Sequence, residues 1–184
     1  MTERIYQLSA KILSYPGSET LQAAKELEAE LVKIDSSYHE VLLPFIEFLS
    51  KQERGAMEEA YTNTFDVQAV CPLEVGYTLF GEDYKRGEFL VRMSDLHAEH
   101  KTLLNQSELA DYLPNVLMLL KEMQESEFKK EFIEKILLPS LSKMLKNFEA
   151  GKGANPYARP IMALNSMLSR QYKMNPTILE VTYE

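Results

Sequence analysis

Residues 114–122 read Pro-Asn-Val-Leu-Met-Leu-Leu-Lys-Glu, a nearly unbroken apolar run that follows a proline. Proline is tolerated in the first turn of a helix, where its missing N–H would have no partner, so the run predicts a helix beginning at Pro114. The apolar residues surround the helix axis instead of forming one stripe along it. We therefore expect this helix to lie in the centre of the protein, covered by other elements.

Helical spacing of apolar residues continues on both sides of this run. The predicted helices cover residues 3–13, 19–35, 41–49, 54–65, 73–80 and 84–100 before it, and 127–147 and 158–172 after it. We expect Ser18 and Ser126 to cap the helices that follow them. Pro72 should start a short helix, and Pro139 should kink a long one. The sequence thus predicts an all-α protein of about eight or nine helices.

The whole chain, residues 1–184, is expected to form one domain. Its apolar fraction of 45% and charged fraction of 26% are ordinary for a globular protein of this length. No internal repeat and no linker rich in Gly, Ser or Pro divides it. Near the end, Leu179, Val181 and Tyr183 alternate with polar groups, so this tail is expected to be extended. The prediction is a single-domain helical bundle.

The cysteine count and the hydropathy indicate where the protein works. Cys71 is the only cysteine, which rules out an internal disulfide and a zinc site built from several cysteines. The first ten residues lack the cationic and apolar regions of a secretory signal, and nowhere do 18 apolar residues run together. We therefore expect a cytoplasmic protein that does not insert into a membrane.

The net charge of −8 and the pI of about 5.1 argue against nucleic acid as a partner, because proteins that bind a phosphate backbone carry basic patches. The same charge is compatible with a cationic peptide partner. It is equally compatible with ordinary solvation, since many soluble cytoplasmic proteins are as acidic.

No residue pattern in the chain predicts catalysis. His97 and His100 lie three residues apart on a predicted helix without a third ligand nearby in sequence, which favours two solvated histidines over a metal site. Cys71 lacks the signature of a nucleophile, so a small buried residue is favoured. Gly151-Lys152-Gly153 lacks the other residues of a phosphate-binding loop and fits a helix end. We expect no catalytic residue, no metal and no cofactor.

Aromatic and acidic residues are concentrated in the middle third of the sequence. The aromatic ones are Tyr61, Phe65, Tyr77, Phe80, Tyr84 and Tyr112, and the acidic ones are Asp66, Glu74, Glu82, Asp83, Glu108 and Asp111. Aromatic residues in a helical bundle often belong to its core. The alternative is a groove with apolar walls and an acidic rim, which would suit an amphipathic peptide with basic residues. The residues alone leave both interpretations open.

Four short motifs in this region occur in the order and spacing of a known family. They are Tyr61-Thr-Asn-Thr-Phe65-Asp66, Tyr77-Thr-Leu-Phe80-Gly81-Glu82 with Lys85-Arg86-Gly87 after it, Glu108-Leu109-Ala110-Asp111-Tyr112-Leu113-Pro114, and Asn155-Pro156-Tyr157-Ala158. Through them the chain resembles the TorD, DmsD and NarJ family of molybdoenzyme assembly chaperones, also called redox enzyme maturation proteins. The third motif has Ala110 where the family usually has proline, and Tyr112 where the TorD and DmsD branches carry histidine. Tyr112 favours the NarJ-like branch, the nitrate reductase delta proteins.

The resemblance implies a cytoplasmic chaperone that binds the N-terminal peptide of the apo catalytic subunit of a molybdopterin oxidoreductase. In the family this holds the subunit for cofactor insertion and assembly, and withholds a twin-arginine signal from export. The candidate peptide-binding residues are Tyr61, Phe65, Asp66, Glu74, Tyr77, Phe80, Glu82, Arg86, Glu108, Asp111, Tyr112 and Pro114. The alternative is a stable helical structural or regulatory subunit of an oxidoreductase complex. Whether the protein forms a homodimer is left open.

Asp111 has two predicted roles, because it lies just before the helix that begins at Pro114. It either caps that helix, or it faces the groove and meets a cationic side chain of the peptide. Asparagine separates the two roles, since it caps a helix about as well as aspartate but carries no charge.

Overall fold

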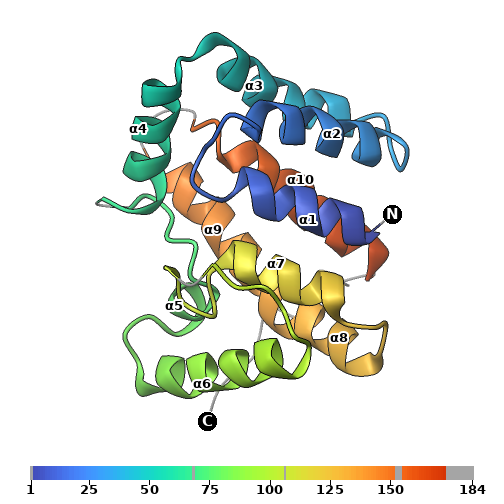
Figure 1. Ribbon diagram of the computed structural model, residues 1–184, viewed down its shortest axis with the longest axis vertical. Helices are drawn as coiled ribbons and strands as arrows, with labels where there is room; N and C mark the ends of the chain where they lie inside the picture. The colour runs from blue at the N-terminus through green and yellow to red at the C-terminus, as the bar shows by residue number, and fades with distance from the viewer. Residues whose placement is uncertain (1, 68, 106, 152–154, 173–184) are drawn as a thin grey trace.

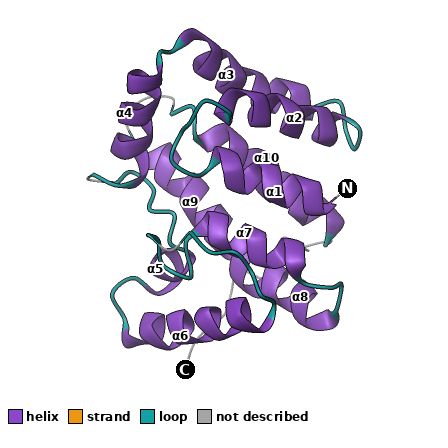
Figure 2. Cartoon of the chain, in the orientation of Figure 1, coloured by secondary structure: helices purple, strands orange, loops and turns teal. Residues whose placement is uncertain are grey.

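The computed structural model describes residues 2–67, 69–105, 107–151 and 155–172 (Figure 1). Over these ranges the regular structure is helical, apart from one isolated β-bridge between Glu74 and Tyr112 (Figure 2). The helices are α1 (Thr2–Ile12), α2 (Thr20–Val32), α3 (Tyr38–Lys51), α4 (Arg54–Phe65), α5 (Val75–Phe80), α6 (Tyr84–Glu99), α7 (Leu113–Glu122), α8 (Glu127–Phe132), the π-helical η1 (Ile133–Leu137), α9 (Leu138–Ala150) and α10 (Ala158–Gln171). Because α8, η1 and α9 follow one another without a break, the described chain forms nine helical rods. The prediction of an all-α bundle is confirmed.

Helix α7 is the buried helix that the apolar run predicts. Seven of its ten residues are buried, and the side chains of Leu117, Leu119 and Leu120 have no exposed surface. Helix α1 packs against both α7 and α2, and in Figure 1 it lies between them. Helix α2 packs on α3, and α10 packs on α3 and α9. The helix at the start of the chain is therefore a central one.

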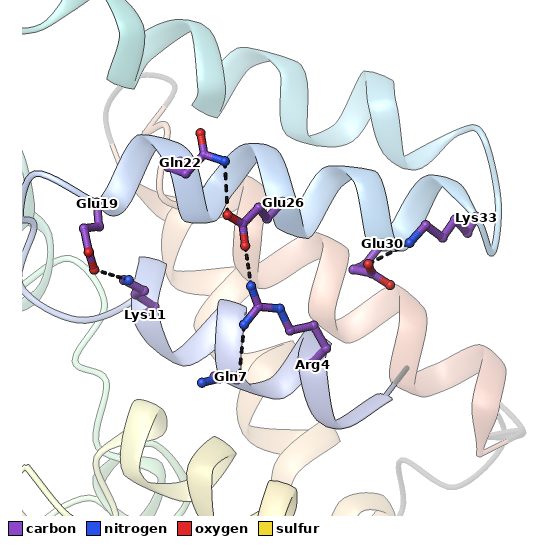
Figure 3. A network of polar contacts seen from close by, with 8 residues as sticks. All are labelled: Arg4, Gln7, Lys11, Glu19, Gln22, Glu26, Glu30 and Lys33. Atoms are coloured by element: carbon purple, nitrogen blue, oxygen red, sulfur yellow. Dashed lines mark hydrogen bonds and ion pairs between the residues drawn. The ribbon is translucent and has the colours of Figure 1, made fainter.

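Charged residues line the outer side of the contact between α1 and α2 (Figure 3). Arg4 pairs with Glu26, and Lys11 pairs with Glu19. Gln22 supports Glu26, because its amide donates to the carboxylate at 3.0 Å. Exposed ion pairs of this kind add little to stability, so the apolar contact between the helices holds them together.

Several predicted boundaries agree with the structure. Helix α4 has the predicted range of 54–65. Ser126 caps α8, and its hydroxyl accepts a hydrogen bond from the amide of Lys129 at 3.2 Å. The helix expected at 41–49 is longer, because α3 begins at the buried Tyr38 and continues through Pro44 to Lys51.

Two predicted helix starts are wrong. Ser18 is no cap, because α2 follows Glu19 and its end has no side-chain cap. Pro72 does not begin a helix either: the chain first runs beside residues 111–113, and α5 starts only at Val75. At Pro72, the backbone pairing with residues 111–113 overrides the local signal.

Pro139 alters the long helix by changing its type. Residues 133–137 form η1, and Pro139 lies in the first turn of α9 directly after it. Proline donates no backbone hydrogen bond, and its ring clashes with the carbonyl four residues earlier, here that of Lys135. In the π-helical turn the amide of Leu138 donates to the carbonyl of Ile133, five residues earlier instead of four.

At the C-terminal side, α9 continues beyond the predicted end at 147 to Ala150, and Gly151 follows it. Lys152, Gly153 and the tail that contains Leu179, Val181 and Tyr183 lie outside the described residues. Among the helices of the described ranges, none combines the length and the apolar character that a membrane span requires.

The ammonium group of Lys129 is buried at the turn between α7 and α8, where only 2% of its side chain is exposed. Nζ donates to the carbonyl of Met123 at 3.0 Å and to the carboxylate of Glu125 at 2.7 Å. It also lies 5.6 Å from the centre of the Tyr6 ring. Lys129 therefore closes this turn and joins it to α1.

We predict that Lys129→Met lowers the free energy of unfolding by about 1–3 kcal/mol, because it leaves the buried carbonyl of Met123 without a donor. Urea unfolding followed by circular dichroism measures the difference. The matched control is Lys130→Met, which removes the same charge from an exposed neighbour and should change stability by less than about 0.5 kcal/mol. Equal losses in the two variants would contradict a specific role for Lys129.

Candidate functional site

Two segments that are far apart in sequence run antiparallel beside each other before α5 and α7. The amide of Val75 donates to the carbonyl of Asp111 at 2.9 Å, and the amide of Leu113 donates to the carbonyl of Leu73 at 2.9 Å. Glu74 and Tyr112 face each other between these bonds. The pairing brings the motif at 108–114 to the amino end of α5, beside the motif that begins at Tyr77.

The carboxylate of Asp111 is buried at this junction and caps α5. Its Oδ2 accepts a hydrogen bond from the amide of Gly76 at 2.9 Å, and the residue has no exposed surface. Burial raises the pKa of Asp111, while the Gly76 amide and the charge of Arg86 act in the opposite direction. A carboxylate at the amino end of a helix is stabilised by the free N–H groups there.

This position corrects the two roles that the sequence predicts for Asp111. The residue before α7 is Tyr112, and α7 has no side-chain cap. Because Asp111 is completely buried, it does not face an open groove in this conformation either. It caps a helix that lies 35 residues earlier in the chain.

Tyr61 and Tyr112 form a buried pair beneath the same region. Their hydroxyl oxygens are 2.7 Å apart, and both hydroxyls reach the carbonyl of Leu13, at 3.1 and 3.3 Å respectively. Burial raises the pKa of Tyr112 to about 12. The pair ties α4 and the start of α7 to the end of α1.

The aromatic residues of α4 belong to the core. Tyr61 and Phe65 pack edge-on against Tyr157, with ring centres 5.7 and 5.0 Å apart, and Phe45 and Phe48 contact the other sides of the same ring. Tyr157, from the fourth motif, is completely buried. For Tyr61, Phe65, Tyr112 and the buried Pro114, the core interpretation is the correct one.

Three carboxylates with exposed or half-buried side chains gather at the surface above this core. We call Asp66, Glu74 and Glu108 the acidic patch. Burial raises the pKa of all three, and their mutual repulsion raises the pKa of Glu74 and Glu108 further. Asp111 also raises the pKa of Glu74, whereas Arg86 lowers it. The patch is therefore a site of accumulated negative charge that a cation would stabilise.

Exposed apolar side chains accompany the acidic patch. Val67 follows Asp66 and is 58% exposed, and Leu109 follows Glu108 and is 46% exposed. Tyr15, which is 56% exposed, packs edge-on against Tyr61 with ring centres 5.5 Å apart. Carboxylates beside apolar side chains form a surface that fits an amphipathic segment with basic residues.

The remaining candidate residues lie on α5 and at the start of α6. The guanidinium group of Arg86 lies 5.1 Å from the centre of the half-exposed Tyr77 ring. Phe80 packs on Phe89 with ring centres 5.6 Å apart, and Glu82 is exposed in the turn before α6. Some of the twelve candidate residues therefore belong to the core, and the others are exposed or half-buried.

The prediction for His97 is wrong. The side chain is only 2% exposed, and its Nε2 lies 2.9 Å from the carbonyl oxygen of Ala110. Burial lowers the pKa of His97, so the neutral ring that donates this hydrogen bond is favoured. His100 is half-buried at the end of α6. His97 thus anchors the loop that carries the acidic patch residue Glu108.

Cys71 is the buried small residue that the sequence favours. It has no exposed surface, and burial raises the pKa of its thiol to about 12, which keeps the thiol protonated. Among the described residues, no three His, Cys, Asp or Glu side chains come together in the way that a metal ion needs.

Three residues that shape the site were missed in the sequence. Leu13 contributes only a backbone carbonyl, so its side chain gives no signal. The role of His97 depends on a contact with Ala110 across a loop. Of these three residues, Gly76 alone offered a local signal, because a glycine inside a short predicted helix often marks a place where another part of the chain comes close to the helix backbone.

We predict that Glu74→Gln stabilises the protein at pH 7. Because folding raises the pKa of the Glu74 carboxyl, its ionisation destabilises the folded protein at pH values above that pKa. This destabilisation disappears as the pH falls below the unfolded pKa of about 4.3. The melting temperature should therefore rise by about 1–3 °C at pH 7, and by less at pH 4. Calorimetry at both pH values measures this, with the exposed Glu82→Gln as control. A lower melting temperature at pH 7 would contradict the electrostatic account of the patch.

We also predict that Gly76→Ala disturbs the junction between α5 and residue 111. An added Cβ would lie 2.7 Å from Asp111 Oδ2 and 2.7 Å from a ring carbon of Phe89. Overpacking of this kind costs about 1–3 kcal/mol, which urea unfolding measures. In Gly87→Ala the new Cβ meets no atom within 4 Å, so this control should be neutral or slightly stabilising. Identical results for the two glycines would show that the junction tolerates the change.

Comparison with known proteins adds a fold relative and a distant sequence relative. No family model matches the chain. Nitrate reductase-like protein NarX of Mycobacterium tuberculosis, from strains CDC 1551 / Oshkosh and ATCC 25618 / H37Rv, is 26% identical over 113 residues. The match covers 61% of this chain but 17% of NarX, so the chain spans only a small part of these relatives.

A crystal structure from Archaeoglobus fulgidus, assigned as a candidate redox enzyme maturation protein, superposes with a TM-score of 0.63 at 21% sequence identity. The match covers 92% of this chain and 94% of the other. The chain therefore shares its fold with a candidate redox enzyme maturation protein, from the group of proteins that its sequence motifs resemble.

Proposed function

We propose that this protein is a cytoplasmic maturation chaperone without catalytic activity. It binds the N-terminal peptide of the apo catalytic subunit of a molybdopterin oxidoreductase, and holds that subunit for cofactor insertion and assembly. The shared fold and the distant likeness to NarX support the maturation role. The observation that carries the peptide-binding part is the acidic patch of Asp66, Glu74 and Glu108 beside exposed apolar side chains.

The acidic patch gives the proposal its physical basis. Like charges that lie near one another and are partly removed from water raise the free energy of the unbound protein. A basic side chain of the peptide relieves this repulsion, and Val67 and Leu109 contact the apolar face of the same peptide. The twin-arginine pair of an exported client would supply two such cations.

The buried candidates have a supporting role in this proposal. Tyr61, Tyr112 and Asp111 hold α4, α5 and the loop before α7 together, so that the exposed side chains keep their positions. The peptide itself meets the exposed and half-buried residues, which are Asp66, Glu74, Tyr77, Phe80, Glu82, Arg86 and Glu108.

The test measures binding of client N-terminal peptides by calorimetry. We predict that Glu108→Gln and Asp66→Asn each weaken binding by about 1–3 kcal/mol, the range for a hydrogen bond to a charged group. Neither variant should lower the melting temperature. The control is Glu40→Gln, which removes an exposed charge from α3 and should bind like the wild type.

Raising the salt concentration from about 50 to 500 mM should slow association more than it speeds dissociation, because the patch steers a basic peptide. Absence of binding to every such peptide, together with tight binding to the folded mature subunit, would overturn the proposal.

The likeness to NarX favours one alternative, a helical subunit that stays with its oxidoreductase. The matching segment is a small part of a much longer nitrate reductase-like protein, so a related sequence exists as a permanent part of another chain. Co-expression with the client followed by size-exclusion chromatography separates the two functions. A chaperone leaves after the client matures, whereas a subunit remains.

A further inference from the structure

A pocket of about 240 Å³ lies between α5 and α9. It is lined by Pro72, Tyr77, Thr78, Lys143, Lys146 and Asn147. Its only charged side chains are the two lysines, which come from the exposed side of α9. A concentration of positive charge is unexpected in a chain whose net charge is −8.

The charge of this pocket is not compensated by the protein, in contrast to the pocket between α1 and α2. There, the cations Arg4 and Lys11 pair with Glu26 and Glu19 across the two helices (Figure 3). In the α5–α9 pocket, Nζ of Lys143 donates to a carbonyl oxygen, that of Leu79, at 3.2 Å. No ion pair is present for either lysine of this pocket among the residues that the structure describes. The pocket therefore offers two ammonium groups to an external anion.

The pocket and the acidic patch lie on the same short element. Glu74 of the patch directly precedes α5, while Tyr77 and Thr78 of the first turn of α5 line the pocket. The pocket thus adjoins the first turn of α5, and Glu74 is the residue that precedes this turn. Val70 extends the surface beside the pocket, because its side chain packs next to Gly151, the residue that follows α9.

We propose that the α5–α9 pocket binds an acidic side chain of the client peptide, while basic residues of the same peptide occupy the acidic patch. This inference rests on the proposed function. Together the two sites favour one orientation of the peptide, because each site binds a charge of the opposite sign. A peptide in the reverse orientation would bring like charges together at both sites. Lys143 and Lys146 thereby determine the direction of binding, which the acidic patch alone leaves undetermined.

The experiment uses the full chain and, as probes, the N-terminal peptides of the molybdopterin oxidoreductase catalytic subunits encoded in the same genome. In the tightest-binding peptide, each Asp or Glu is replaced in turn by Asn or Gln. Lys146→Met is the test variant, because no described hydrogen bond or ion pair involves its side chain. Lys25→Met, on the exposed side of α2, removes the same charge elsewhere and is the matched control.

We expect Lys146→Met to weaken the affinity for the peptide about two- to fivefold, while Lys25→Met binds the peptide like the wild type. Neutralising one particular peptide carboxylate should cause the same loss, and should cause none in the Lys146→Met protein, as a double-mutant cycle requires for two groups in contact. Lys146→Glu should be rescued by a lysine at that peptide position.

Three outcomes would overturn the inference. The first is that Lys146→Met binds the peptide with wild-type affinity, and the second is that its loss adds to the loss from every peptide carboxylate. The third is that the tightest-binding peptide has no acidic residue near its basic ones. In those cases a loss of affinity in Glu108→Gln leaves the proposed function standing. If no peptide binds the wild-type chain, the proposed function fails, and the pocket assignment fails with it.

Discussion

The hydrogen bonds between residues 111–113 and the start of α5 join two parts of the chain that share no local contact. Backbone pairing fixes the register of the two segments, and the carboxylate of Asp111 then binds the first amide of α5 that the pairing leaves open. A six-residue helix such as α5 is unstable by itself, because nucleation is costly and few bonds repay it. Asp111 therefore supports α5 at its amino end, in addition to the packing of α5 against α9 and α6. The exposed residues on both sides of this junction take their positions from it.

The same junction also brings several carboxylates close together. Neighbouring carboxylates raise the cost of ionising Glu74 and Glu108, so the arrangement opposes stability. The structure offsets the cost with the amide of Gly76 and the charge of Arg86, and with apolar packing beneath. Proteins retain such unfavourable groupings mainly where a function requires them.

The sequence predicts those parts of the fold that depend on neighbouring residues. Helices α4 and α7 follow from apolar spacing and from Pro114, because periodicity reports burial directly. Apolar spacing does not predict that Asp111 caps α5, because the carboxylate of Asp111 and the amide of Gly76 are 35 residues apart in sequence. For the same reason His97 was expected in solvent: its helix position gives no information about a loop that returns over it.

The candidate site shows the same division. Family-like motifs predict a candidate region, but a motif does not separate residues that would touch a ligand from residues that hold the fold. Tyr61 and Phe65 illustrate this, because their partner ring, Tyr157, lies in the fourth motif and is nearly 100 residues away. Asp66 directly follows Phe65 and yet is exposed, because α4 ends between them.

The two tyrosine hydroxyls that meet at the carbonyl of Leu13 have a consequence for biosynthesis. Tyr112 follows Leu13 by 99 residues, which a ribosome adds in about 5–20 s at about 5–20 residues per second. Until then, α1 can pack on α2 but lacks α7, its other main neighbour. Until Tyr112 has been added, the nascent chain therefore lacks the contact that joins α4 and the start of α7 to the end of α1. The surface that the proposed chaperone offers to a client is not held in place during that interval, so it forms only after that residue has been added.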